Sequence, residues 1–109
     1  MKNYALKWLT QRITASILIP LTFWFIYSAI SLSKMAYYEI EIFFQSYLNA
    51  FLFFIMMQSM LLHSKLGIQT IIEDYVTSKK TAKFIKVSIN YLIYFFMILI
   101  TINILRMVL

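Results

Sequence analysis

Long apolar runs alternate with short polar segments along this chain of 109 residues. Residues 13–33, 42–64 and 87–105 contain no Lys, Arg, Asp or Glu. Each run is close to the roughly 20 residues that a helix needs to cross a hydrocarbon core about 30 Å thick. Because apolar residues continue beyond the second run as far as residue 72, we expect helices at about residues 10–34, 44–76 and 84–107. The pattern predicts an all-α membrane protein with three transmembrane helices in a single transmembrane domain, residues 1–109.

Composition supports this class. The chain is 62% hydrophobic and 13% charged, with one Gly and one Pro. A soluble domain of this length does not have enough interior to bury that much apolar surface. Cysteine is absent, which excludes a disulfide framework and a thiolate metal site. We therefore expect function to depend on the few polar residues within or beside the spans.

The basic residues predict the orientation of the chain. Eight of the ten lie before the first charge-free run or between the second and the third. Since segments rich in Lys and Arg stay on the cytoplasmic side, we expect the N-terminus inside and the C-terminus outside. The net charge of +6 then reflects this asymmetry and contact with anionic lipid, and nucleic acid is not an expected partner. The eight residues are Lys2, Lys7, Arg12, Lys65, Lys79, Lys80, Lys83 and Lys86.

The only histidine, His63, lies in the second span. If the apolar part of that helix covers residues 50–72, His63 is near the middle of the bilayer. Asp74 is eleven residues further on, or about 16 Å along a helix, and with Tyr75 it would mark the inner interface. An ionisable group at mid-depth is costly unless something binds it, so His63 is the first candidate site.

Helical rotation predicts which side chains share a face with His63. At about 100° per residue, Gly67 lies ~40° away, Thr70 and Asp74 ~20° away, and Lys65 ~200° away. A glycine one turn from the imidazole would give clearance for a flat ligand. Lys65 would extend towards the inner interface or pair with a partner subunit.

Each of these residues also has a structural interpretation that stays open at this stage. His63 could form an interhelical hydrogen bond or line a water-filled path, and Gly67 could mark close helix packing. Asp74 with Tyr75 could be an ordinary interface pair. Arg12 could be a topology anchor at the mouth of the first helix.

The combination of motifs carries a family resemblance. Trp8-x-x-Gln11-Arg12-x-Thr14-Ala15 forms the entry to the first span, His63-x-x-x-Gly67 lies in the second, and Asp74-Tyr75-Val76 ends it. This arrangement resembles the D-type hydrophobic membrane anchor of succinate dehydrogenase, a cytochrome b-type anchor, over residues 7–105. Similar anchors occur in fumarate reductases, so the resemblance leaves the direction of the reaction open. The wider family also includes anchors that lack haem.

The resemblance implies roles for individual residues. His63 would be an axial ligand of haem b, and therefore the metal ligand to the haem iron, with Gly67 providing clearance. Tyr75 would hydrogen-bond a ubiquinone carbonyl, Asp74 would lie in the quinone pocket, and Arg12 would lie near the haem propionates or that pocket.

A haem with two imidazole ligands needs two histidines, and this chain has one. The second would come from a partner, the C-type cytochrome b anchor of the same complex, so that this chain forms half of a heteromeric helix bundle. Met97 in the third span is the weaker intrachain alternative for the second ligand.

The resemblance also implies a function for the whole chain. It would be the membrane-anchor subunit of succinate:ubiquinone oxidoreductase, respiratory complex II of the tricarboxylic acid cycle, and would not be catalytic alone. It would dock the iron-sulfur and flavoprotein subunits in a bacterial inner membrane or a mitochondrial inner membrane. The alternatives are a small structural or holin-like three-helix protein without a redox cofactor, and a channel or transporter subunit that uses His63 as a proton relay.

Overall fold

The computed structural model describes residues 4–109, so Lys2, one of the eight basic residues, lies outside the described residues. These residues form four α-helices and no strand. The helices are α1 (Tyr4–Leu32), α2 (Tyr37–Gln45), α3 (Tyr47–Tyr75) and α4 (Lys79–Val108). Three of them, α1, α3 and α4, are long and apolar enough to cross a membrane. The expected all-α class and three candidate spans are confirmed.

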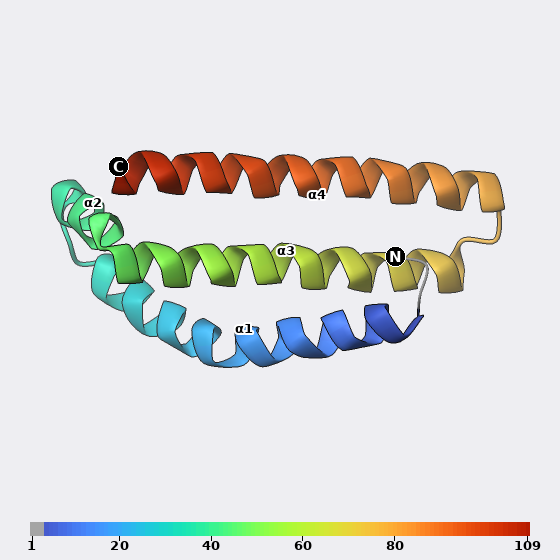
Figure 1. Cartoon of the computed structure of the whole chain (residues 1–109), viewed down its shortest axis with the longest axis horizontal. Helices are drawn as coiled ribbons and strands as arrows, with labels where there is room; N and C mark the ends of the chain where they lie inside the picture. Colours follow the sequence, from blue (N-terminus) through green and yellow to red (C-terminus); the bar gives the residue numbers. More distant parts are fainter. Residues whose placement is uncertain (1–3) are drawn as a thin grey trace.

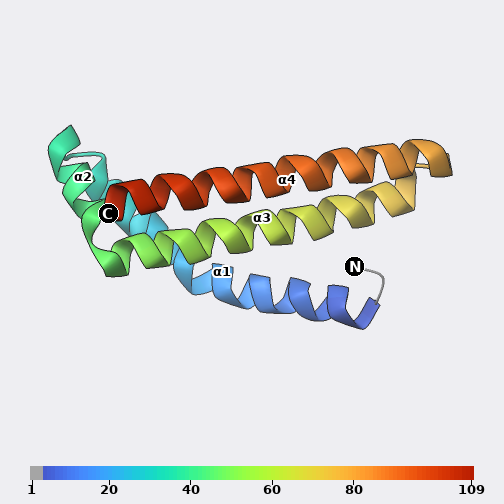
Figure 2. The same ribbon diagram turned by 45° about the horizontal axis from the view of Figure 1, so that its top comes forward.

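The three long helices lie side by side in an elongated bundle, with α3 between α1 and α4 (Figures 1 and 2). The bundle measures 50 × 24 × 22 Å, so its long axis matches the roughly 40–45 Å of a bilayer with its headgroups. We call the end that carries Tyr4, Tyr75 and the lysines that begin α4 the lysine-rich end. The opposite end, where α2 lies, is the α2 end.

Few side chains are buried within the chain, and almost half of those are polar. The buried apolar residues are Ala50, Met56, Leu66, Ile72, Ile93 and Ile104, and the buried polar ones are Thr14, Ser28, Ser59, Lys65 and Gln69. Helices in lipid associate through small and polar side chains because the lipid itself solvates the large apolar ones. Many large apolar side chains are accordingly exposed on the outside of the bundle.

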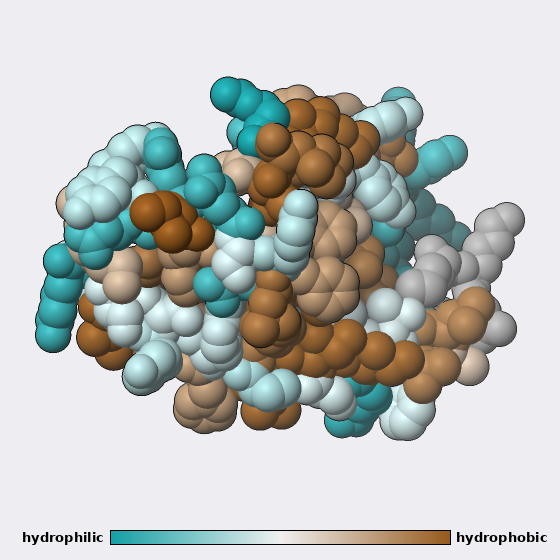
Figure 3. All heavy atoms as spheres, turned by 60° about the vertical axis from the view of Figure 1, so that its left-hand side comes forward, coloured by the Kyte–Doolittle hydropathy of each residue, from teal (hydrophilic) through white to brown (hydrophobic). Residues whose placement is uncertain are grey.

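The ends of the bundle are polar. Figure 3 looks onto the α2 end and shows hydrophilic residues gathered there among apolar ones. This end has a polar hollow of about 420 Å³ lined by Tyr37, Glu41, Gln45, Asn103, Arg106 and Met107. Polar ends around an apolar middle are what a membrane-spanning bundle requires.

The helix α2 was not predicted. The sequence indicated a loop because Glu39 and Glu41 interrupt the apolar pattern. In the structure, the ring of Phe43 stacks on Trp24 of α1 with centroids 6.2 Å apart, and Phe44 meets Phe53 of α3 edge-on at 5.1 Å. These contacts with residues distant in sequence hold the short helix.

The long helices also differ in their bounds from the prediction. Helix α1 begins by Tyr4 and α4 begins at Lys79, several residues before the expected starts at 10 and 84. Lysine is a good helix former, and the Ser78 side chain caps α4 by accepting from the Thr81 amide at 3.3 Å. The charged flanks therefore extend the helices beyond their apolar cores.

Helix α1 bends in its middle (Figure 1). Pro20 lies inside it and has no N–H to donate to the carbonyl of Ser16, one turn earlier. A missing bond of this kind is a common cause of helix kinks. The bend lets the first half of α1 run along α3 at its own angle, and the candidate site lies beside that half.

Candidate functional site

A cavity of about 740 Å³ lies between the first half of α1 and the second half of α3. Its volume falls within the roughly 300–1,000 Å³ of typical ligand and cofactor pockets. Three of the predicted site residues line it: His63, Asp74 and Arg12. We call it the His63 cavity. Its full lining is Tyr4, Lys7, Trp8, Gln11, Arg12, Ala15, His63, Leu66, Thr70, Glu73 and Asp74.

The rotation predicted for α3 agrees with this lining. His63, Thr70 and Asp74 all face the cavity, as their angular positions on the helix require. Asp74 and His63 therefore line one continuous cavity. The first turns of α1 run along the stretch of α3 between His63 and Asp74 and form the other wall.

His63 has a hydrogen-bond partner within the chain. Its Nδ1 lies 3.0 Å from the Oγ1 of Thr14, a buried residue of α1. Within residues 4–109, the structure gives the other ring nitrogen, Nε2, no hydrogen-bond partner. His63 lies two residues from Leu61, the central residue of α3. The imidazole is therefore held near the middle of the bundle by one nitrogen.

The α1 wall of the cavity combines a cation, an aromatic ring and an amide. The Arg12 guanidinium carbon lies 5.3 Å from the centre of the Trp8 ring, a cation–π distance. The Oε1 of Gln11 is buried and, among the described residues, has no hydrogen-bond donor. An unpaired buried acceptor is costly, so Gln11 suits a ligand group that donates a hydrogen bond. The Arg12 guanidinium suits a group with a negative charge.

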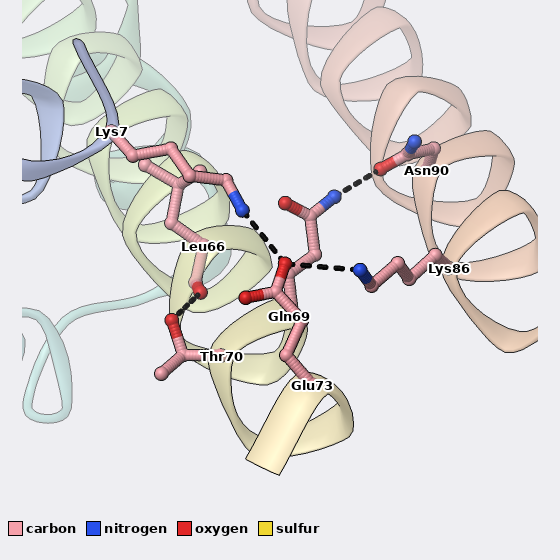
Figure 4. Close-up of polar contacts among 7 residues, drawn as sticks. All are labelled: Lys7, Leu66, Gln69, Thr70, Glu73, Lys86 and Asn90. Carbon is pink, nitrogen blue, oxygen red and sulfur yellow. Dashed lines mark hydrogen bonds and ion pairs between the residues drawn. The ribbon is translucent and has the colours of Figure 1, made fainter. Parts of the chain in front are cut away.

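At the lysine-rich end, Glu73 joins the three long helices. Its Oε1 accepts from Lys7 Nζ of α1 and from Lys86 Nζ of α4, each at 3.0 Å. Figure 4 shows both lysines converging on this carboxylate, with Gln69 and Asn90 bonded one turn deeper. Glu73 is therefore held in a structural ion cluster, whereas Asp74 beside it has no ion pair with any residue from 4 to 109.

Side-chain pairs join α3 to α4 in one antiparallel register. From one pair to the next, going away from the lysine-rich end, the residue number on α3 falls by the same amount as the residue number on α4 rises. The pairs are Glu73 with Lys86 at 3.0 Å, Gln69 with Asn90 at 2.8 Å, Lys65 with Tyr94 at 2.7 Å and Gln58 with Thr101 at 3.3 Å.

Lys65 belongs to this set of pairs, which corrects the expectation that it extends to the interface or to a partner subunit. It is buried at 8% exposure, donates to the Tyr94 hydroxyl and lies 4.5 Å from the centre of that ring. Because Lys65 points to α4 and His63 to α1, the two side chains lie on opposite sides of α3, as their ~200° separation predicted.

The other sequence candidates lie outside the cavity lining. Tyr75 is the last residue of α3 and is 79% exposed. Gly67 is absent from the lining, although a Cβ built there would meet no atom within 4 Å, so space adjoins it. Met97 lies on α4 beside a different hollow, lined by residues such as Gln58 and Tyr94.

The sequence allowed an interhelical hydrogen bond as one role for His63, but it did not identify Thr14 as the partner. Thr14 belongs to the motif at the entry to the first span but had no assigned role. The opposite charges of Lys7 and Glu73 could have indicated this contact. If these two residues are paired on antiparallel helices, Thr14 lies two turns further along α1, at a level within about one turn of His63 on α3.

Within the described part of the chain, no three His, Asp or Glu side chains gather to hold a bare metal ion. A metal bound through His63 would have to bring most of its ligands with it or share the site with another chain.

The fold and the cavity define a class: a three-span helical membrane protein whose single histidine lies in an α1–α3 cavity near mid-depth. A family model described as succinate dehydrogenase/fumarate reductase transmembrane subunit matches residues 3–104. The chain belongs to this family. No match is found among curated proteins or solved structures. Family membership does not support the alternatives of a holin-like protein or a channel component.

Proposed function

We propose that this chain is the D-type anchor of succinate:ubiquinone oxidoreductase, and that the His63 cavity is its contribution to the redox site. The observation that carries the proposal is the continuous cavity from His63 to Asp74, with the motif residues Trp8, Gln11 and Arg12 on its other wall. The chain itself performs no succinate chemistry. It anchors the complex, provides one haem ligand and forms part of the ubiquinone pocket.

The residues at the His63 cavity are suited to binding haem b. His63 Nδ1 is bonded to Thr14, which leaves Nε2 for an axial bond, and ligating histidines usually have their other nitrogen hydrogen-bonded in this way. A Cβ at Gly67 would meet no atom within 4 Å, which fits the clearance proposed there for a flat ring. When bound, haem b supplies one-electron transfer at a potential tuned by its ligands. Since the chain has one histidine, the second ligand comes from the C-type cytochrome b partner.

The quinone part of the proposal concerns the end of α3. Tyr75 has an exposed hydroxyl that can donate to a ubiquinone carbonyl while its ring packs against the quinone ring. Asp74 lies at the rim of the His63 cavity and can deliver a proton to the reduced quinone. Arg12 faces the same cavity, where it would pair with a haem propionate or help to bind the quinone.

The lysine-rich end is the proposed inner face of the membrane, with the N-terminus inside and the C-terminus outside. Tyr75 is exposed at this end, so an iron-sulfur subunit bound there would complete the quinone pocket and receive electrons from the flavoprotein subunit. The membrane is a bacterial cytoplasmic membrane or a mitochondrial inner membrane.

The test for the haem role is purification of the chain's complex from membranes, followed by a reduced-minus-oxidised spectrum. We expect the flavoprotein and iron-sulfur subunits to co-purify and b-type bands to be present. His63→Ala should abolish those bands, and Met97→Leu, the control, should retain them. Bands that persist in an assembled His63→Ala complex would refute ligation by this histidine.

The test for the quinone role is Tyr75→Phe, which removes a hydroxyl and leaves the ring. Loss of one hydrogen bond of about 1.4 kcal/mol predicts roughly tenfold slower quinone reduction, with dye reduction by the soluble subunits unchanged. Tyr47→Phe is the matched control, because Tyr47 is similarly exposed, at 72%, at the other end of α3. Equal loss of both activities would point to failed assembly and count against the role of Tyr75.

A further inference from the structure

The hydroxyl of Thr14 has three close neighbours. Its Oγ1 lies 2.8 Å from the Thr10 carbonyl oxygen, 3.1 Å from the Gln11 carbonyl oxygen and 3.0 Å from His63 Nδ1. Both carbonyl oxygens belong to the preceding turn of α1, and both can only accept. Thr14 is 5% exposed, so water has little access to this contact.

The hydroxyl has one proton to share among these neighbours. If that proton pointed at His63, the Thr14 oxygen would face a carbonyl oxygen at 2.8 Å with no proton between them, which is repulsive. The proton is therefore donated within α1, as is common for threonine in helices. Towards His63 the oxygen can then only accept, so Nδ1 must carry a hydrogen.

A neutral imidazole has one ring proton, and a proton on Nδ1 leaves a lone pair on Nε2. In the neutral ring, the contact with Thr14 therefore selects the tautomer that is protonated on Nδ1.

We infer that Thr14 is a positioning residue that holds His63 as the Nδ1–H tautomer and presents the Nε2 lone pair for an axial bond to haem iron. The iron-directed part of this inference rests on the proposed function, whereas the tautomer does not. The contact joins two helices, so it also restricts rotation of the imidazole ring. Because the Thr14 hydroxyl is itself polarised by donating to a carbonyl, it is a better acceptor for the Nδ1–H bond.

The tautomer can be measured directly because His63 is the only histidine of the chain. The full chain is labelled with 15N,13C-histidine, reconstituted in phospholipid vesicles without haem, and studied by solid-state NMR that correlates ring nitrogens with ring carbons. We expect a protonated Nδ1 and an unprotonated Nε2. Thr14→Val should shift the population towards the Nε2–H tautomer that predominates in free histidine, and Thr14→Ser should restore the wild-type spectrum.

The matched control is Thr22→Val, the same substitution at an exposed position of α1. It should leave the His63 signals unchanged. A wild-type chain with its proton on Nε2 would overturn the inference, as would a Thr14→Val chain that keeps Nδ1 fully protonated.

In the purified complex, the readout is the midpoint potential of the haem and the electron paramagnetic resonance spectrum of its oxidised form. An imidazole that loses its Nδ1–H acceptor donates less charge to the iron, so Thr14→Val should shift the potential to more positive values and broaden the low-spin signal. Haem content should stay within about twofold, and Thr14→Ser should match the wild type. A Thr14→Val complex with wild-type potential and spectrum would overturn the positioning role.

Failure of the two proposals can be told apart. A complex in which His63→Ala keeps its haem would refute the proposed ligand and the iron-directed half of the inference. The tautomer assignment would still be decided by the NMR result alone, which requires neither haem nor a partner subunit.

Discussion

Replacing Glu73 with Gln would remove the charge that holds the three long helices together at the lysine-rich end. Its Oε1 accepts from Lys7 and Lys86, each at 3.0 Å, with side-chain exposures between 18% and 35%. Pairs with this access to solvent contribute about 0.2–1 kcal/mol each. Without the carboxylate, two ammonium groups also converge with no counter-charge. Two pairs therefore predict a loss of about 1 kcal/mol, or a fivefold larger unfolded-to-folded ratio.

The assay is unfolding of the full chain in mixed micelles by sodium dodecyl sulfate, followed by the fluorescence of its two tryptophans. Glu73→Gln should unfold at a lower detergent fraction than the wild type. The neighbouring Asp74→Asn is the matched control, because it removes the same charge from a residue that has no ion pair within the described part of the chain. It should lie within a few tenths of a kcal/mol of the wild type.

Salt provides the second criterion. The Debye length falls from about 10 Å at 0.1 M to about 3 Å at 1 M, so high salt should shrink the difference between Glu73→Gln and the wild type. Equal destabilisation by Asp74→Asn, or a Glu73→Gln effect that high salt leaves unchanged, would refute the ion-cluster explanation.

Three further substitutions test the packing of the bundle. Tyr94→Phe removes the acceptor of the buried Lys65 ammonium and should cost about 1–2 kcal/mol in the same unfolding assay. Gln69→Leu removes the bond to Asn90 and should cost about 1 kcal/mol, whereas no loss would mean that this pair is not formed in lipid. Pro20→Ala should straighten α1. For a change of about 20° its first turn would move by about 8 Å, measurable as a longer distance between spin labels on α1 and α3.

The sequence was sufficient to predict the three membrane spans and to predict which residues share one face of α3. Charge-free runs identified the three long helices, because each run by itself has to be apolar and long enough to cross the bilayer. The angles around α3 correctly grouped His63, Thr70 and Asp74, because a helix fixes its own periodicity. Neither argument needs knowledge of a second helix.

What the sequence could not provide depends on how helices meet. The contact from Thr14 to His63 and the pairing of Lys65 with Tyr94 follow from interhelical register, which no local pattern encodes. Helix α2 was missed for the same reason, because ring contacts such as that of Phe43 with Trp24 stabilise it.

The single register between α3 and α4 has a consequence for how the chain enters its membrane. Since Lys65 and Gln69 have their partners on the next helix, the two helices can leave the insertion machinery together as a hairpin whose polar groups are already paired. A shift of α4 along α3 by one turn would break all of these pairs together, so the pairs favour a single register of the hairpin. Helix α1 takes no part in these pairs, and its own contacts with α3 bring Thr14 to His63 and form the other wall of the cavity. A haem or quinone that contacts both walls would therefore also hold α1 in place.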